Sequence, residues 1–198
     1  MRTLTLVLIA VGVCLASEWP CNNPLGCLPF SHPEDNTGYR VNNSNIWIGG
    51  ASAASNRGWL TQEGIQVIVS LSGEHAGERH PNMHYLVKDI NGINHKHIRA
   101  HVLDVHEYLK THSDKRVLVY CKFGSEISPV MIAGHLLLND WTLGVDEALE
   151  AVSDALERVR PNPTYVVELY DIESSLYVMA LEPKARRARY LESLRDEL

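Results

Sequence analysis

The sequence lacks any large concentration of positive charge. Its 198 residues contain 18 Lys and Arg against 24 Asp and Glu, which gives a formal net charge of −6. General nucleic-acid binding needs clustered basic side chains opposite the phosphate backbone, so this balance argues against that class of protein. One short basic run, Lys184 to Arg189, lies near the C-terminus and is typical of a solvated helix face.

Long apolar runs are also missing after the first residues. Leu4 to Leu15 is almost wholly apolar, but it is too short to span a bilayer comfortably. It follows the positively charged start Met1-Arg2. Residues 14–16, Cys-Leu-Ala, place small residues where a signal peptidase prefers them, so we predict a secretory signal peptide over residues 1–16. An uncleaved membrane anchor is the alternative. No later segment is apolar enough to cross a membrane, so we expect no membrane span in the mature chain.

The last four residues resemble a retrieval signal. Residues 195–198 read Arg-Asp-Glu-Leu, which differs from the sequence KDEL only by Arg for Lys and keeps the positive charge. Together with an independent signal peptide, this ending indicates a soluble resident of the endoplasmic reticulum lumen that binds the retrieval receptor through its C-terminus.

Cysteine is scarce, and two of the four cysteines lie in a segment rich in Pro, Asn and Gly. Cys21 and Cys27 flank five residues there, and an oxidising lumen would let them form a disulfide; two unpaired thiols are the alternative. Asn42 begins an N-glycosylation sequon, whose occupancy the sequence leaves open. We therefore expect a loop-rich arm over residues 17–44.

The remaining chain predicts one α/β domain over residues 45–180, followed by a helical tail over residues 181–198 with the retrieval signal. No internal repeat, low-complexity tract or second domain boundary is present. Strand patterns alternate with helix patterns, which predicts a central, mainly parallel sheet flanked by helices on both faces. The expected strands are 46–48, 65–71, 84–88 and 117–120, and the expected helices are 52–62, 98–109, 129–138, 146–159, 165–177 and 184–194.

Residues 117–129 combine a buried strand, a tight loop and the first turn of a helix. The segment resembles the phosphate loop of the cysteine-dependent protein phosphatases, above all the dual-specificity subfamily. That family has His-Cys, five residues, then Arg followed by Ser or Thr. Cys121, Gly124 and Ser128 fit this pattern, whereas Tyr120 replaces the His and Ile127 replaces the Arg. The corresponding loop consists of Cys121, Lys122, Phe123, Gly124, Ser125, Glu126, Ile127 and Ser128.

The resemblance extends from about Asn45 to Tyr177. It includes an opening strand with a small-residue turn at 46–55, a second strand at 64–71 and a Pro-Asn turn with a closing helix at 160–169. It implies the cysteine-dependent phosphatase fold. It also implies that Cys121 holds the nucleophile position and that Asp89, which follows the strand at 85–88, holds the general-acid position.

In this family the Cys thiolate attacks phosphorus, and backbone N–H groups with a helix N-terminus hold the phosphate oxygens. The Arg completes that cradle with a bidentate fork. Ile127 supplies neither a donor nor a charge, and Glu126 places a carboxylate beside a loop built for anions. The family's equivalent of Lys122 usually points away from the phosphate.

We therefore predict a catalytically inactive domain without a cofactor, acting as a binding or scaffold module for a lumenal protein or phosphoprotein. The alternative is an active phosphatase that uses Cys121 on phosphoprotein or on a phosphorylated sugar or lipid. Each of these two residues also has a purely structural interpretation. Cys121 would then be a thiol of the core, and Asp89 a surface carboxylate that caps a loop.

A second group of residues has spacing suited to a metal. His97, His101 and Asp104 lie at i, i+4 and i+7 on one predicted helix, a pattern that can hold a transition metal. With ten His in the chain, such pairs arise by chance, so we predict no metal site and keep this arrangement as an alternative.

Overall fold

The central strand of the sheet is β5 (Val117–Tyr120). It pairs in parallel with β2 (Ile46–Gly49) on one side and with β3 (Val67–Ser70) on the other. Beyond β3 lies β4 (His84–Val87), also parallel, and β1 (Tyr39–Arg40) closes the opposite edge antiparallel to β2. Every residue of β2, β3 and β5 is buried, as expected for parallel strands covered on both faces.

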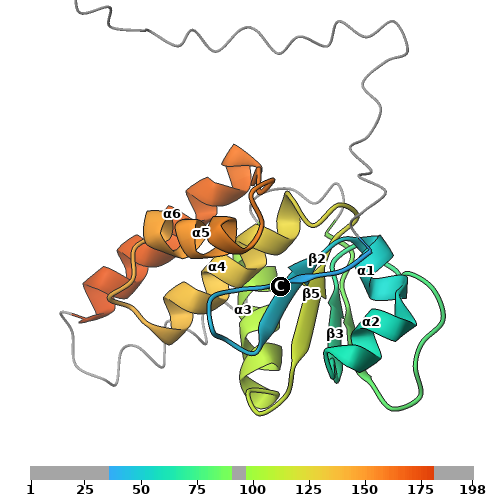
Figure 1. Ribbon diagram of the computed structural model, residues 1–198. Helices are drawn as coiled ribbons and strands as arrows, with labels where there is room; N and C mark the ends of the chain where they lie inside the picture. The colour runs from blue at the N-terminus through green and yellow to red at the C-terminus, as the bar shows by residue number, and fades with distance from the viewer. Residues whose placement is uncertain (1–35, 91–96, 181–198) are drawn as a thin grey trace, which may run out of the picture. The chain divides into compact units, whose positions relative to one another are not determined.

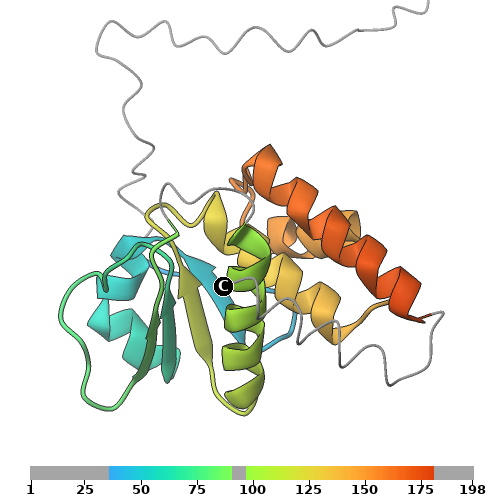
Figure 2. The ribbon, with the colours of Figure 1, turned by 180° about the vertical axis from the view of Figure 1, so that it is seen from behind.

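The computed structural model describes residues 36–90 and 97–180 of the chain (Figures 1 and 2). Two short helices cover one face of the sheet, and longer helices cover the other, with the last two packed outside α4. The helices are α1 (Ala51–Ser55), α2 (Arg57–Gln62), α3 (Ile98–Thr111), α4 (Ile127–Asn139), α5 (Val145–Ala155) and α6 (Pro163–Ala180). The predicted α/β class with a mainly parallel sheet is confirmed.

Side chains of β5 alternate between two apolar clusters. Val117 and Val119 point into the larger core beneath α3 to α6, whereas Leu118 and Tyr120 point into the smaller one beneath α1 and α2. This alternation follows from the two-residue repeat of a strand. It explains why β5 is apolar at every position and why its sequence predicts a strand so clearly.

Several element boundaries differ from the sequence prediction. The helix predicted over 52–62 is two helices, because Asn56 interrupts it and its side chain accepts a hydrogen bond of 3.1 Å from the Trp59 N–H, capping α2. Strand β1 lies inside the segment predicted as an irregular arm. Asn42, at φ 47°, occupies the turn between β1 and β2 and is exposed, which leaves its sequon accessible.

Other predictions fall outside the described residues. They are the signal peptide over 1–16, the disulfide between Cys21 and Cys27, the tail helix over 184–194 and the retrieval signal at 195–198. Within the described ranges, no helix has the length and apolar character needed to span a membrane.

Two histidines face each other between α3 and α4. The rings of His106 and His135 lie 5.0 Å apart, centroid to centroid, and both side chains are buried. The Nδ1 atom of each ring is buried without a hydrogen-bond partner among the described residues. Burial, with His106 nearby, lowers the pKa of His135 from 6.5 to about 4. Burial also lowers the pKa of His106.

We expect this pair to make stability depend on pH. Between pH 6.5 and about 4 the unfolded chain binds a proton that His135 in the folded chain resists, so the free energy of unfolding falls as pH falls through this window. His135 alone lowers the free energy of unfolding by about 3 kcal/mol across this window. Urea unfolding of His135→Leu should show a flatter pH dependence than the wild type over this range. The exposed His97, changed to Gln, is the control; equal slopes for His135→Leu and wild type would contradict the expectation.

Candidate functional site

The loop from Cys121 to Glu126 joins β5 to α4 at the carboxyl edge of the sheet. Cys121 directly follows the last residue of β5, and it is 5% exposed and packed in the larger apolar cluster. Since β2, β3, β4 and β5 are parallel, their carboxyl ends share this edge, where α/β proteins bind their ligands. The fold therefore places the predicted phosphate loop at a typical ligand-binding position.

The conformation of the loop depends on a close contact with the turn after β2. Gly124 has φ +75°, and a Cβ atom at this position would lie 2.6 Å from the carbonyl oxygen of Gly49. The backbone N–H of Ala51 also donates a 3.2 Å hydrogen bond to the carbonyl of Lys122. Only glycine combines this left-handed conformation with so close an approach.

The far end of the loop is held by the segment after α5. The backbone N–H of Arg160 donates a hydrogen bond of 2.8 Å to the carbonyl of Ser125. Helix α4 begins two residues later, so its N-terminus, with its unpaired N–H groups and positive dipole end, adjoins the loop. This backbone arrangement is suited to an anion.

The side chains of the loop do not complete that arrangement. Ile127 is the first residue of α4; it is 7% exposed and belongs to the larger apolar cluster. Glu126 at the N-cap is exposed and makes no capping hydrogen bond. Lys122 is exposed, and its ammonium lies 5.2 Å from the ring centroid of its neighbour Phe123. No basic side chain of this loop thus occupies the position of the family's arginine.

Ser128 retains a polar group beside the loop. Its side chain is fully buried in the first turn of α4, and its Oγ atom has no hydrogen-bond partner among the described residues. Buried hydroxyls are nearly always hydrogen-bonded, so this one remains available to a ligand or to water.

Tyr120, at the position of the family's histidine, anchors a neighbouring loop. Its hydroxyl accepts a 2.7 Å hydrogen bond from the Ala76 N–H and lies 3.3 Å from the Glu74 carbonyl, to which it donates. The hydroxyl also lies 3.2 Å from Nδ1 of His75. Burial raises the pKa of Tyr120 above its usual range. Sequence reasoning missed this role, although a tyrosine that ends a buried strand needs a partner for its hydroxyl.

Asp89 follows β4 and lies at the same edge of the sheet. It forms an isolated antiparallel bridge with Ser72, and its carboxyl carbon would lie 2.9 Å from a Cβ atom on Gly73. The side chain is exposed. Because β3 separates β4 from β5, at roughly 4.8 Å per strand, the carboxyl ends of β4 and β5 lie about 10 Å apart. The general-acid role of Asp89 stays a prediction.

The alternative metal site receives no support. His97 precedes α3, and His101 and Asp104 lie on it, but the Asp104 carboxylate forms an ion pair with Lys88. Within residues 36–90 and 97–180, no group of three His, Cys, Asp or Glu side chains is arranged to hold a metal ion.

Comparisons with known proteins find solved structures and nothing else. No family model matches the sequence, and neither does any curated protein. A mouse dual-specificity phosphatase complexed with zinc tungstate is 25% identical with a TM-score of 0.61, covering 79% of this chain and 99% of its own. DUSP15 is 16% identical with a TM-score of 0.63, covering 82% and 97%. The human tyrosine phosphatase-like serine/threonine/tyrosine-interacting protein is 17% identical with a TM-score of 0.57, covering 72% and 99%.

We expect Tyr120→Phe to loosen the loop after β3, because the Ala76 N–H and the Glu74 carbonyl lose their shared partner. The cost should be about 1–2 kcal/mol in the free energy of unfolding. Amide hydrogen exchange at Ala76 should become faster. Tyr177→Phe, which removes an exposed hydroxyl, is the control, and unchanged exchange at Ala76 would show that the hydroxyl does not hold this loop.

Proposed function

We propose that this chain, whose described domain has the dual-specificity phosphatase fold, is a catalytically inactive relative that acts as a binding or scaffold module in the endoplasmic reticulum lumen. The observation that carries this proposal is the buried, apolar Ile127 at the first position of α4. The family places there the arginine that binds the transferring phosphoryl group.

The loss of this arginine removes the largest electrostatic contribution of the site. An arginine acting on a transferring phosphoryl group contributes about 10³–10⁵ in rate elsewhere. Ile127 contributes no hydrogen-bond donor, and the exposed Glu126 beside it repels a phosphate dianion. The solvent-exposed Lys122 is the nearest cation along the loop, and its ammonium lies over Phe123 instead.

A binding role is supported by the parts of the site that remain. The contact of Gly124 with Gly49 and the hydrogen bond from Arg160 to Ser125 preserve the loop backbone without the arginine. One structural neighbour is named a tyrosine phosphatase-like serine/threonine/tyrosine-interacting protein. For the present chain we propose a lumenal protein as partner.

The proposed location rests on the two ends of the sequence. The apolar run before Ala16 and the terminal Arg-Asp-Glu-Leu support a lumenal protein that the retrieval receptor returns. Antibody staining of the full chain beside a chain that lacks residues 195–198 would test it; secretion of only the shortened chain is the expected result.

The Oγ of Ser128, which has no hydrogen-bond partner in the described part of the chain, favours one second candidate, a working cysteine-dependent phosphatase. In that reaction the Cys121 thiolate forms a bond to phosphorus while the P–O ester bond breaks, and Asp89 gives its proton to the leaving oxygen. Water then cleaves the S–P bond and releases phosphate. Both residues lie at the carboxyl edge of the sheet, which this candidate requires.

We expect the mature chain, residues 17–198, to hydrolyse an aryl phosphate no faster than its Cys121→Ser variant. Without the arginine the thiolate has no cation at the phosphoryl group, so both rates should equal the background. The measurement is release of the aryl alcohol at several pH values. A rate that disappears with Cys121→Ser would establish the phosphatase and end the inactive proposal.

We further expect Glu126→Gln combined with Ile127→Arg to bind inorganic phosphate at least tenfold more tightly than the wild type. The change removes a repelling charge and adds a bidentate donor, and each factor of ten corresponds to about 1.4 kcal/mol. Calorimetric titration measures the affinity, and Glu126→Gln alone separates the two effects. If the double variant, folded by circular dichroism, binds no better than the wild type, the assignment of this loop as a phosphate site is wrong.

A further inference from the structure

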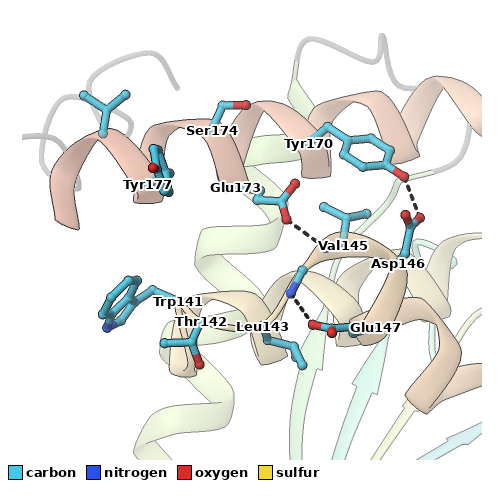
Figure 3. A pocket seen from close by; sticks show the side chains of 12 residues that line it. Trp141, Thr142, Leu143, Val145, Asp146, Glu147, Tyr170, Glu173, Ser174 and Tyr177 are labelled. Atoms are coloured by element: carbon cyan, nitrogen blue, oxygen red, sulfur yellow. Dashed lines mark hydrogen bonds between the residues drawn. The ribbon is translucent and has the colours of Figure 1, made fainter. Parts of the chain in front are cut away.

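An open groove lies between α6 and the residues that lead into α5 (Figure 3). Its volume is about 1030 Å³. One wall is formed by α6, and the other by the turn before α5 together with the first residues of that helix. None of its lining residues belongs to the loop 121–128, so the groove is a separate surface from the candidate phosphate site.

Exposed apolar side chains gather at this groove. Five large apolar residues are exposed in the described part of the chain, and four of them line it. Tyr177 is 65% exposed, Val178 58%, Trp141 48% and Tyr170 40%. Single exposed apolar residues need no explanation, but a group rimmed by polar residues is typical of an interaction site.

Three carboxylates border the same groove. Asp146 accepts a 2.6 Å hydrogen bond from the Tyr170 hydroxyl, Glu147 a 2.9 Å bond from the N–H of Gly144, and Glu173 a 3.2 Å bond from the N–H of Val145. Each bond uses one oxygen of its carboxylate. Among the residues described by the structure, no basic side chain forms an ion pair with any of the three.

Aromatic rings beside carboxylates that have no ion-pair partner among the described residues form a surface suited to arginine in particular. A guanidinium group stacks on an aromatic face and also binds a carboxylate through two parallel hydrogen bonds. A second copy of this chain is a poor occupant, because each copy carries a net charge of −6 and would bring further acidic surface to the groove. A basic segment complements it.

The chain contains one such segment directly after α6. Residues 184–191 read Lys-Ala-Arg-Arg-Ala-Arg-Tyr-Leu, with four positive charges followed by an aromatic and an aliphatic residue. We propose that this segment docks in the groove, with arginines at the carboxylates and against the rings of Trp141 and Tyr177. This assigns the basic run a binding role in place of the solvated helix face that its sequence pattern suggests.

The length of the chain permits this arrangement. Tyr170, the lining residue farthest from the end of α6, lies about 15 Å along the helix from Ala180, at the helical rise of roughly 1.5 Å per residue. The nine residues from Leu181 to Arg189 span up to about 30 Å when extended, which suffices to turn back along the helix. Pro183 favours such a turn, because it lacks the N–H that a continuing helix needs. The last seven residues, with the retrieval signal, remain beyond the docked segment.

Site-directed photo-cross-linking in the full mature chain tests the proposal. Benzoylphenylalanine in place of Tyr177 keeps an aromatic ring in the groove, and mass spectrometry identifies the peptides it captures. We expect capture of residues 184–191 within the same chain. Asp146→Asn with Glu173→Gln keeps the hydrogen-bond acceptors but removes two charges, and it should lower the yield at least threefold. Glu150→Gln with Asp154→Asn removes two charges from α5 outside the groove and should leave the yield unchanged.

A second variant tests the same contact without changing any residue of the groove, so its effect cannot come from misfolding of the groove. Arg186→Gln, Arg187→Gln and Arg189→Gln together change only residues beyond α6, and they should lower the yield as the groove variant does. Captured peptides from a second copy, captured peptides from another segment, an unchanged yield in the arginine variant or no cross-link at all would each overturn the proposal.

Discussion

The close contact between Gly124 and the Gly49 carbonyl is the constraint on which the candidate site depends. It joins the loop after β5 to the turn after β2, and it leaves no room for a side chain at Gly124. The backbone bonds from Ala51 to Lys122 and from Arg160 to Ser125 secure the two ends of the same loop. All three contacts are made by backbone atoms. None of them involves the side chain at position 127, so the loop conformation does not require an arginine there.

The sequence predicted the strands well where burial on both faces restricts the residue types to apolar ones. β5 was predicted with its observed ends, because a strand covered on both faces is apolar at every position. The resemblance predicted a tight loop between β5 and α4 with Gly124 in it, and Gly124 has φ +75° there. The break at Asn56 was missed although its signal was present, because Asn is a preferred helix cap. β1 was missed because its two residues show no alternation and derive their strand structure from pairing with β2.

Other features of the site needed the structure. Composition cannot tell whether Ile127 points into the core or toward the loop opening, because either position suits an apolar residue at the start of a helix; the structure places it in the core. Tyr120 was read as a lost histidine, yet its hydroxyl is the shared partner of Ala76 and Glu74. Ala76 lies 44 positions before Tyr120 in the sequence, and Glu74 lies 46 positions before it. Local sequence patterns carry no information about contacts over such separations.

The two surfaces of this domain differ in the kind of ligand that their groups suit. At the candidate phosphate loop, the backbone is suited to an anion, whereas the acidic Glu126 and the uncharged Ile127 are not. At the groove, three carboxylates and four exposed apolar residues form a surface that the proposed basic segment would complement. Turnover at the first surface would require a cation that residues 121–128 do not place at position 127, whereas association at the second requires only a basic partner.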